Sequence, residues 1–276
     1  MGRELYESDA RARDMFERAN DCLGFRITDI MFGEDADALQ ATEVTQPAVF
    51  LHSVVAAACK APCAPDMVAG HSLGEFSALV AAGALDFEDG LRLVSKRACA
   101  MQRCCETVPG TMAAVLGGDA AVIEDVCASV AGTVIAANYN CDAQIVISGE
   151  ADAVAEASAL LLEKGARKVV LLKVGGAFHS PLMEPARVEL AEAIDAVSMR
   201  EPLCPIYQNV DALPHTDPAE IREGLLMQLT SPVLWTQSVR NMAADGATSF
   251  LEIGNGSVLR GLVKKIARGA ELDGLC

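Results

Sequence analysis

The segment between residues 109 and 176 constrains the fold of this 276-residue chain more than any other part. Short β-like runs rich in Val, Ile and Ala alternate there with two helix-like runs, and glycines separate them. The runs cover residues 111–116, 120–130, 133–137, 144–148, 151–164 and 168–174. Their order, βαββαβ, is typical of a ferredoxin-like α+β unit. We therefore predict a small subdomain over residues 109–175.

The stretches on either side have a different pattern. Residues 1–108 and 176–276 hold long helix-like segments with a few short apolar runs, at 67–69, 205–210 and 249–253. Short apolar runs between helices favour buried strands. We expect one α/β-hydrolase-like subdomain with a parallel sheet, into which the small subdomain is inserted.

Composition excludes several classes of protein. The formal net charge of −16 argues against nucleic-acid binding, because phosphate neutralisation needs clustered Lys and Arg. The ten cysteines follow no paired spacing, and the nearest approach to a metal pair, Cys59 with Cys63, has no second pair. No run of eighteen apolar residues occurs, and the first residues are charged where a signal peptide is apolar. We expect a cytoplasmic protein with no membrane segment, no metal and no cofactor.

The run Gly70-His71-Ser72-Leu73-Gly74 lies after a predicted strand and before a predicted helix. A GxSxG in that context is typical of a nucleophile elbow, in which flanking glycines allow the sharp turn that exposes the serine hydroxyl. N–H groups at the start of the following helix can hold an oxyanion. A chance Gly-Ser turn is the alternative.

A serine nucleophile needs a base, most often a histidine. Of the four histidines, His71 precedes the serine, His52 lies in an apolar helix and His215 lies in a Pro-flanked turn. His179 remains, in a loop after an apolar strand, where functional side chains are commonly presented. The 38 acidic residues offer too many candidates for a third member.

Arg97 lies at the edge of the apolar stripe of a predicted helix over residues 87–105. A guanidinium in that position needs an anion. It either pairs with a structural carboxylate or clamps a substrate carboxylate through its planar fork.

Several motifs together resemble the malonyl-CoA:acyl carrier protein transacylase family. They are residues 45–48 (TQPA), 70–79 (GHSLGEFSAL), Arg97, 138–140 (NYN), 144–149 (QIVISG), 176–180 (GAFHS), 208–210 (QNV) and 254–259 (GNGSVL). Their order and approximate spacing match the family from Met1 to about Gly269.

The resemblance implies a ping-pong reaction in fatty-acid biosynthesis. Ser72 attacks the thioester of malonyl-CoA, His179 takes the serine proton, and the pantetheine thiol of acyl carrier protein resolves the malonyl-serine ester. Arg97 matches the arginine that holds the malonyl carboxylate, and Gln46 lines the same pocket. The version of the histidine loop at 177–180 is similar to that of malonyl-preferring members rather than branched-extender ones.

The resemblance also implies roles for less obvious residues. Gln228 matches the position whose backbone carbonyl orients the histidine, which explains why no acid can be singled out. The N–H of Leu73 matches an oxyanion donor. Asn138, Asn140 and Lys168 match positions near bound CoA.

One part of the family pattern has no match in this chain. Family members begin with a strand that runs into a Gly-Gln-Gly turn, whose glutamine N–H is a second oxyanion donor, and residues 1–5 match the sequence just downstream. Losing one such donor typically costs about 10²–10³ in rate. We expect either a start site placed too late or a truncated chain, so that these 276 residues alone are weakly active and less stable than a form with an in-frame upstream extension.

An acidic enzyme needs a local basic patch to receive an acidic carrier protein. The predicted last helix carries one candidate patch, Arg260, Lys264, Lys265 and Arg268, and the last predicted strand of the small subdomain begins with another, Arg167 and Lys168. A merely solvated face explains each of them equally well. Three other readings stay open: a trans-acting acyltransferase of a polyketide pathway, a serine thioesterase or esterase, and a non-catalytic scaffold. We expect a monomer.

Overall fold

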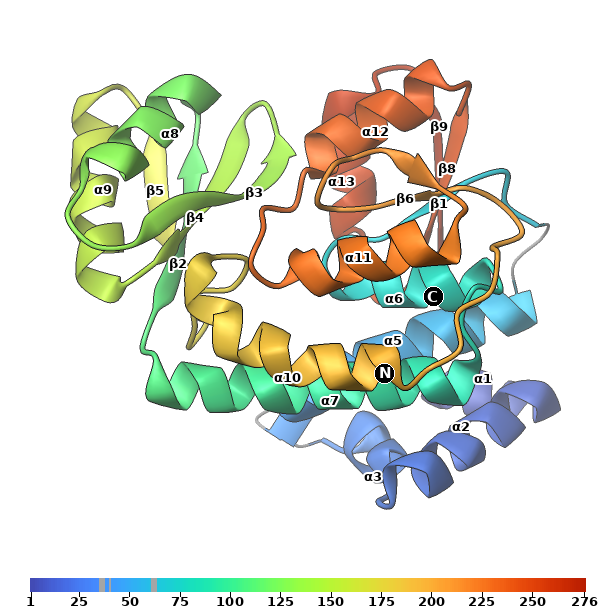
Figure 1. The fold of residues 1–276 in the computed structure, drawn as a ribbon. Helices are drawn as coiled ribbons and strands as arrows, with labels where there is room; N and C mark the ends of the chain where they lie inside the picture. The colour runs from blue at the N-terminus through green and yellow to red at the C-terminus, as the bar shows by residue number, and fades with distance from the viewer. Residues whose placement is uncertain (35–37, 40, 61–63) are drawn as a thin grey trace.

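The computed structural model describes residues 1–34, 38, 39, 41–60 and 64–276. Cys63, which the sequence analysis considered with Cys59 as a possible metal pair, lies outside the described residues. The architecture is mixed α/β (Figure 1). A four-stranded sheet with two helices forms one end of the molecule, and shorter strands with the last three helices form the other. Long helices run beneath both ends.

The four-stranded sheet follows the βαββαβ element order expected from the sequence. It contains β2 (Thr111–Leu116), β3 (Val134–Cys141), β4 (Gln144–Gly149) and β5 (Lys168–Leu171), with helices α8 (Ala120–Ser129) and α9 (Ala151–Glu163). The strand order is β3-β4-β2-β5, and every pairing is antiparallel. Alternate residues such as Ala113 and Ile147, which are paired across β2 and β4, point into a buried apolar cluster beneath the two helices.

The remaining strands are short and form two separate sheets. These strands are β1 (Val68–Ala69), β6 (Ile206–Tyr207), β7 (Pro214–His215), β8 (Ser249–Ile253) and β9 (Glu271–Leu275). Strand β1 pairs in parallel with β6, and β8 pairs in parallel with β9, whereas β7 runs antiparallel to β6. The single parallel sheet expected from the sequence is thus replaced, among the described residues, by a mixed three-stranded sheet and a separate parallel pair, whose second strand β9 was not predicted.

The main core lies between long helices. They are α5 (Thr42–Lys60), α6 (Leu73–Ala81), α7 (Phe87–Thr107) and α10 (Glu184–Asp195). Phe50 of α5 is fully buried and stacks on Phe87, with ring centroids 6.5 Å apart. Burying one such side chain contributes about 1.5–3 kcal/mol. Gly90 makes the close approach of α5 and α7 possible, because a Cβ there would lie 2.8 Å from the Phe50 ring.

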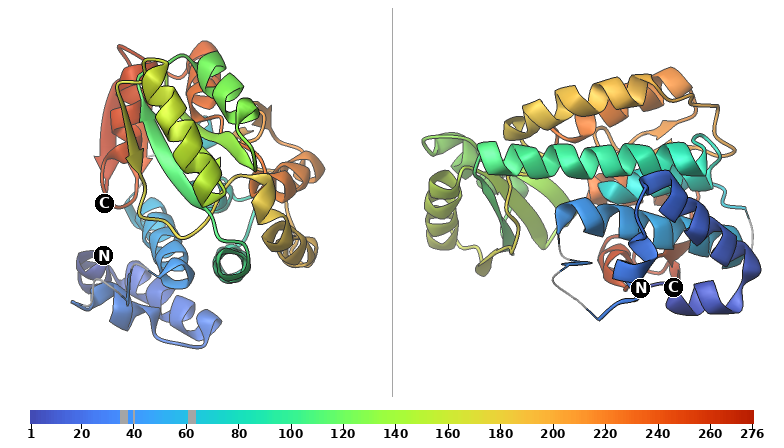
Figure 2. Two further views of the ribbon diagram at one scale, coloured as in Figure 1. Left: turned by 90° about the vertical axis from the view of Figure 1, so that its left-hand side faces the viewer. Right: turned by 90° about the horizontal axis from the view of Figure 1, so that it is seen from below.

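The other helices frame this core. They are α1 (Arg3–Ser8), α2 (Ala10–Leu23), α3 (Ile27–Phe32), α11 (Pro218–Gln228), α12 (Trp235–Ala244), α13 (Val258–Ile266) and the 3-10 turn η1 (Pro181–Met183). Helix α2 packs against α5 and α7 (Figure 2), and its first turn is capped by the Asp9 carboxylate, which accepts from the N–H groups of Arg11 and Ala12. No helix within the described ranges is long and apolar enough to cross a membrane.

Strand β3 joins the small sheet to the rest of the molecule. The Val233 N–H donates to the Ala137 carbonyl at 2.8 Å, and the Tyr139 N–H donates to the Val233 carbonyl at 2.9 Å. The Thr236 hydroxyl donates to the Tyr139 carbonyl at 2.8 Å. These bonds hold the edge of the sheet against the start of α12, beside the turn that carries Ser72.

Candidate active site

Ser72 lies in a strained turn between β1 and α6. Its backbone angles are φ 52° and ψ −107°, which a non-glycine residue rarely adopts and which cost about 1–3 kcal/mol. Gly70 is required by the same turn, because a Cβ there would lie 1.9 Å from the carbonyl carbon of Gly74. The second glycine is not under that constraint, since a Cβ at Gly74 meets nothing within 4 Å.

The side chain of Asn209 holds the turn with two hydrogen bonds. Its Oδ1 accepts from the Ser72 N–H at 2.7 Å, and its Nδ2 donates to the Gly70 carbonyl at 2.7 Å. The Ser72 N–H is therefore occupied. The Leu73 N–H opens helix α6 and has no backbone partner among the described residues, so it is placed to donate to an oxyanion near Ser72.

His179 faces Ser72 from the loop before η1. Its Nδ1 lies 2.9 Å from the Gln228 backbone carbonyl, and its Nε2 lies 2.7 Å from the Ser72 Oγ. A carbonyl only accepts, so Nδ1 carries the proton and Nε2 accepts from the serine hydroxyl. The loop is held by Ser148, whose hydroxyl donates to the Phe178 carbonyl at 2.7 Å.

The electrostatics keep His179 neutral. Burial lowers its pKa to about 3, and the nearby Arg97 guanidinium and His71 act in the same direction, while hydrogen bonds to the backbone at Gln228 and Ser231 oppose them. A neutral imidazole is the form that can accept a proton from a serine hydroxyl. His179 therefore stays in the form that can accept a proton throughout the neutral pH range.

Arg97 is a buried cation beside the serine, with 1% of its surface exposed. Its Nη1 donates to Gln46 Oε1 at 2.5 Å, and its Nη2 donates to Ser72 Oγ at 2.9 Å and to Gln228 Oε1 at 3.3 Å. Burial lowers its pKa to about 10, so it stays protonated near neutral pH. Within the described ranges it forms no ion pair and its Nε lacks a hydrogen-bond partner.

A buried cation held by neutral partners is costly unless an anion joins it. Of the two alternatives left open by the sequence, a direct structural carboxylate partner is not found among the described residues. The guanidinium fork thus lies next to the serine oxygen with amide and hydroxyl partners that an incoming carboxylate can replace.

Sequence reasoning missed a buried carboxylate in the next layer. Glu75, in the first turn of α6, has no exposed surface. It accepts from Gln208 Nε2 at 3.0 Å, from the Asn209 N–H at 2.9 Å and from Gln228 Nε2 at 3.0 Å. Its place in the first turn of a helix gives no sign of burial, because a glutamate there usually faces solvent.

The residues expected near CoA are not gathered in one place. Asn140 on β3 accepts from the His71 Nε2 at 2.8 Å, one residue from the serine. Asn138, two residues earlier, is buried beside Val233. Lys168 is exposed at the start of β5, the strand at the opposite edge of the sheet from β3.

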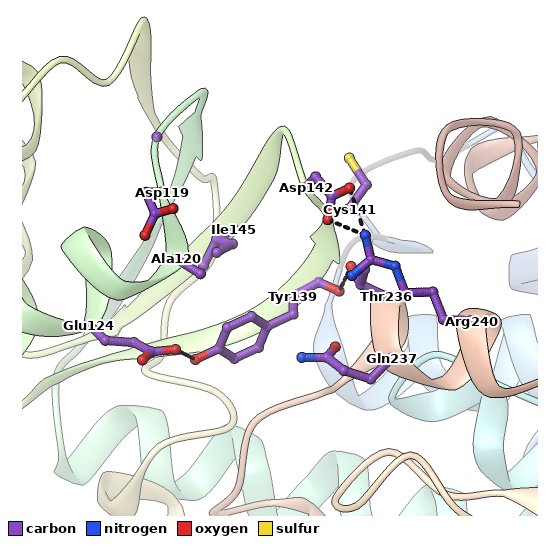
Figure 3. Close-up of a pocket in the computed structure, with 11 residues that line it drawn as sticks. Asp119, Ala120, Glu124, Tyr139, Cys141, Asp142, Ile145, Thr236, Gln237 and Arg240 are labelled. Carbon is purple, nitrogen blue, oxygen red and sulfur yellow. Dashed lines mark hydrogen bonds and ion pairs between the residues drawn. The ribbon is translucent and has the colours of Figure 1, made fainter. Parts of the chain in front are cut away.

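A separate cavity of about 370 Å³ lies between β3 and α12 (Figure 3). Figure 3 shows Arg240 directed at Asp142 and the Tyr139 hydroxyl directed at Glu124. None of the residues around Ser72 described above lines this cavity. No group of three or more His, Cys, Asp or Glu in the described part of the chain is placed to hold a metal ion.

The site is built from segments far apart in the sequence. Ser72 comes from the start of α6, Arg97 from α7, His179 from a loop, Gln46 from α5 and Gln228 from the end of α11. A half-buried serine that is hydrogen-bonded to a buried histidine, with an adjacent guanidinium and a helix N-terminus, provides the groups that a serine-based acyl-transfer site uses.

Comparisons with known proteins agree with that class. The acyl transferase domain family matches residues 1–272. The malonyl CoA-acyl carrier protein transacylase of Bacillus subtilis (strain 168) is 43% identical over 273 residues, which are 97% of this chain and 86% of that protein. The chain therefore belongs to the acyl transferase domain family, among the malonyl CoA-acyl carrier protein transacylases.

Solved structures extend the comparison. The crystal structure of MCAT from Streptococcus pneumoniae is similar with a TM-score of 0.94 and 41% identity, covering 99% of this chain and 90% of that one. A malonyl-transacylase in complex with its type II PKS acyl-carrier protein is similar with a TM-score of 0.93 and 35% identity, covering 99% of this chain and 88% of that one.

Proposed function

We propose that the protein is an acyl-carrier-protein S-malonyltransferase, which moves the malonyl group from malonyl-CoA to the pantetheine thiol of acyl carrier protein. The observation that carries this proposal is the buried Arg97 Nη2, 2.9 Å from the Ser72 Oγ. In a malonyl ester on Ser72, only a carbonyl carbon and a methylene separate Oγ from the free carboxylate. That carboxylate falls within reach of the guanidinium.

In the first half-reaction, the Ser72 Oγ attacks the thioester carbon of malonyl-CoA. His179 Nε2 takes the hydroxyl proton, and its other proton stays on Nδ1, hydrogen-bonded to the Gln228 carbonyl. The Leu73 N–H donates to the oxyanion of the tetrahedral intermediate. The C–S bond then breaks, and the proton on Nε2 passes to the CoA sulfur.

In the second half-reaction, His179 removes the proton of the carrier-protein thiol. The thiolate sulfur attacks the ester carbon, the C–O bond to Ser72 breaks, and the proton returns to the serine oxygen. Gln46 holds the other arm of the Arg97 fork through both steps. Asn138, Asn140 and Lys168 are proposed to contact CoA, with no cofactor or metal taking part.

The proposed activity fits a division of the chain into two subdomains. Residues 1–108 and 176–276 form an α/β-hydrolase-like catalytic part, and residues 109–175 form an inserted ferredoxin-like part. The antiparallel strand order β3-β4-β2-β5 and the parallel β1 and β6 pair support this division. We place the protein in the cytoplasm as a monomer, which light scattering on the purified chain would check.

Covalent labelling tests the reaction directly. The protein is mixed briefly with malonyl-CoA and analysed by intact-mass and peptide mass spectrometry. A malonyl adduct on Ser72 is expected, and none on Ser72→Ala. Absence of an adduct on the unaltered chain would leave the scaffold reading in place.

Arg97→Ala separates a malonyltransferase from an esterase. Removing the guanidinium deletes the partner of the malonyl carboxylate, so malonyl transfer should fall by about 10²-fold or more while acetyl-CoA becomes a better competitor. An esterase that uses water would hydrolyse simple thioesters about as fast with either residue.

The docking face for the carrier protein is proposed to be helix α13. Its polar side carries Arg260, Lys264 and Lys265, with Arg268 just beyond its end. Reversing Lys264 and Lys265 to Glu should raise the KM for carrier protein, most at low salt, and leave that for malonyl-CoA unchanged. Equal effects on both substrates would count against this face.

The similar complex with a type II PKS acyl-carrier protein favours one alternative, a trans-acting role in a polyketide pathway. The same chemistry serves both pathways, so the carrier protein decides between them. Comparing kcat/KM for a fatty-acid carrier protein with that for a polyketide carrier protein, both in the holo form, tests which one this surface prefers.

A further inference from the structure

The carboxylate of Glu75 lies behind the reacting residues and touches none of the expected positions of substrate. It is fully buried, and burial raises its pKa, whereas the hydrogen bonds from Gln208, Asn209 and Gln228 and the charge of Arg97 act in the opposite direction and favour the carboxylate. Here three donors satisfy it, one on Oε1 and two on Oε2. Two of the residues that supply these donors also contact Ser72 or His179.

The two donors on Oε2 belong to residues that hold the reacting groups. Asn209 gives its backbone N–H to Glu75 at 2.9 Å, while its side chain clamps the turn on both sides of Ser72. Gln228 gives its Nε2 to Glu75 at 3.0 Å, while its backbone carbonyl accepts from the His179 Nδ1. The carboxylate thus anchors the supports of the nucleophile and of the base together.

The Gln228 amide also lies between two opposite charges. Its Nε2 faces Glu75, and its Oε1 accepts from the Arg97 Nη2 at 3.3 Å. Turning the amide over would set an NH₂ against the guanidinium and an oxygen against the carboxylate. The two charges therefore fix one orientation of the amide, and the Nε2 in that orientation also reaches the Ser72 carbonyl at 3.1 Å.

We infer that Glu75 is a positioning residue for the proposed transfer reaction: its negative charge orients the Gln228 amide and the Asn209 backbone, and through them aligns His179 and Ser72. The inference rests on the proposed function, since it assigns Glu75 a role in the acylation of Ser72. Glu75 acts through its neighbours and takes no part in the proton transfers between Ser72 and His179.

Two substitutions separate the charge of this residue from its shape. Glu75→Gln keeps the shape and loses the charge, and its NH₂ must face either Gln208 or the pair of donors on the other side. Glu75→Asp keeps the charge and shortens the side chain by a methylene. An alignment role for the charge predicts faster acylation for Asp than for Gln, whereas a packing role predicts the reverse.

The measurement is the time course of Ser72 labelling by malonyl-CoA, followed by quenched-flow mass spectrometry. We expect Glu75→Gln to slow labelling about 10- to 100-fold and to reach the same final extent as the unaltered protein. Glu75→Asp should recover at least part of that rate. A proportional loss of rate and final extent, or faster labelling by Gln than by Asp, would overturn the inference.

A variant far from the site controls for lost stability. Thr28→Val removes a buried hydrogen bond between α2 and α3, in which the Asn20 Nδ2 donates to the Thr28 hydroxyl at 3.0 Å. It should lower the melting temperature without slowing Ser72 labelling. Failure of the proposed function itself gives a different result, which is no adduct on the unaltered protein.

Discussion

The Ser72 site and the cavity between β3 and α12 each contain an arginine and a carboxylate. These charged groups are buried at the Ser72 site and exposed at the cavity. At the Ser72 site, Arg97 and Glu75 are almost fully buried and are joined through a neutral amide. At the cavity, Arg240 and Asp142 pair directly at 2.8 Å and are 54% and 71% exposed.

The difference shows how burial changes what a charge does. Two exposed charges are solvated by water whether or not they pair, so the ion pair contributes little to the free energy of unfolding and its geometry is loosely fixed. A buried charge must be held by fixed hydrogen bonds, and these also fix its direction. At the Ser72 site, the charges are therefore held by oriented amides next to a strained backbone. At the cavity, the ion pair between Arg240 and Asp142 is held by no such fixed groups within the described ranges.

The largest effect should come from removing the base. His179→Ala should slow Ser72 labelling about 10²- to 10⁴-fold, because no other group accepts the serine proton at 2.7 Å. His215→Ala is the matched control, since that imidazole is half-buried and pairs with the more exposed carboxylates of Asp211 and Glu220. Similar losses in both variants would show that the comparison of buried and exposed groups is wrong.

The turn itself offers a matched pair of substitutions. Gly70→Ala should lower the free energy of unfolding by about 2–4 kcal/mol, because the new methyl group would lie 1.9 Å from backbone. Gly74→Ala meets open space within helix α6 and should change it by no more than about 1 kcal/mol, in the stabilising direction. Urea denaturation of both variants measures the contrast.

The pKa of His179 predicts a characteristic pH dependence. Its pKa is lowered to about 3 in the folded protein, against 6.5 for an ordinary histidine, so Ser72 labelling should stay nearly flat as the pH falls from 7.5 to about 5. Labelling that falls with a midpoint near 6.5 would contradict the low pKa.

The same shift acts on stability. Below pH 6.5 the unfolded state binds a proton that folded His179 does not, so the free energy of unfolding falls by up to about 1.4 kcal/mol per pH unit toward pH 3. His179→Gln should remove that contribution. Parallel pH–stability curves for the two proteins would show that another group dominates.

The smallest effect is expected at the cavity. Arg240→Ala breaks the pair with Asp142 but leaves both partners solvated, so the free energy of unfolding should change by less than about 1 kcal/mol. Ser72 labelling should be unchanged. A loss of several kcal/mol in the free energy of unfolding, measured by urea denaturation, would contradict the weak contribution expected of an exposed ion pair.

Local features could be predicted from the sequence, and remote ones could not. The turn at Ser72, the βαββαβ order and the helix carrying Arg97 all follow from patterns within a few residues. The contacts that complete the site join Ser72 to Asn209, 137 residues away, and His179 to Gln228, 49 residues away. No periodicity records such contacts, which is why the orienting carbonyl could be inferred only from the family resemblance.

Glu75 illustrates a second limit of the sequence. A glutamate in the first turn of a helix usually faces solvent, where it interacts favourably with the helix dipole. The burial of Glu75 depends on three donors from distant segments, and the sequence around position 75 does not indicate any of them. The role of Lys168 near CoA stays a prediction, since it rests on the family resemblance alone.

The bond between His71 and Asn140 has a mechanical consequence. His71 is adjacent to Ser72, its ring lies 5.7 Å from that of Trp235, and its Nε2 donates to Asn140 on β3. The edge strand of the small sheet is therefore tied to the turn that bears the nucleophile. Any swing of that sheet to admit a bulky thioester must either carry Ser72 with it or first break this bond.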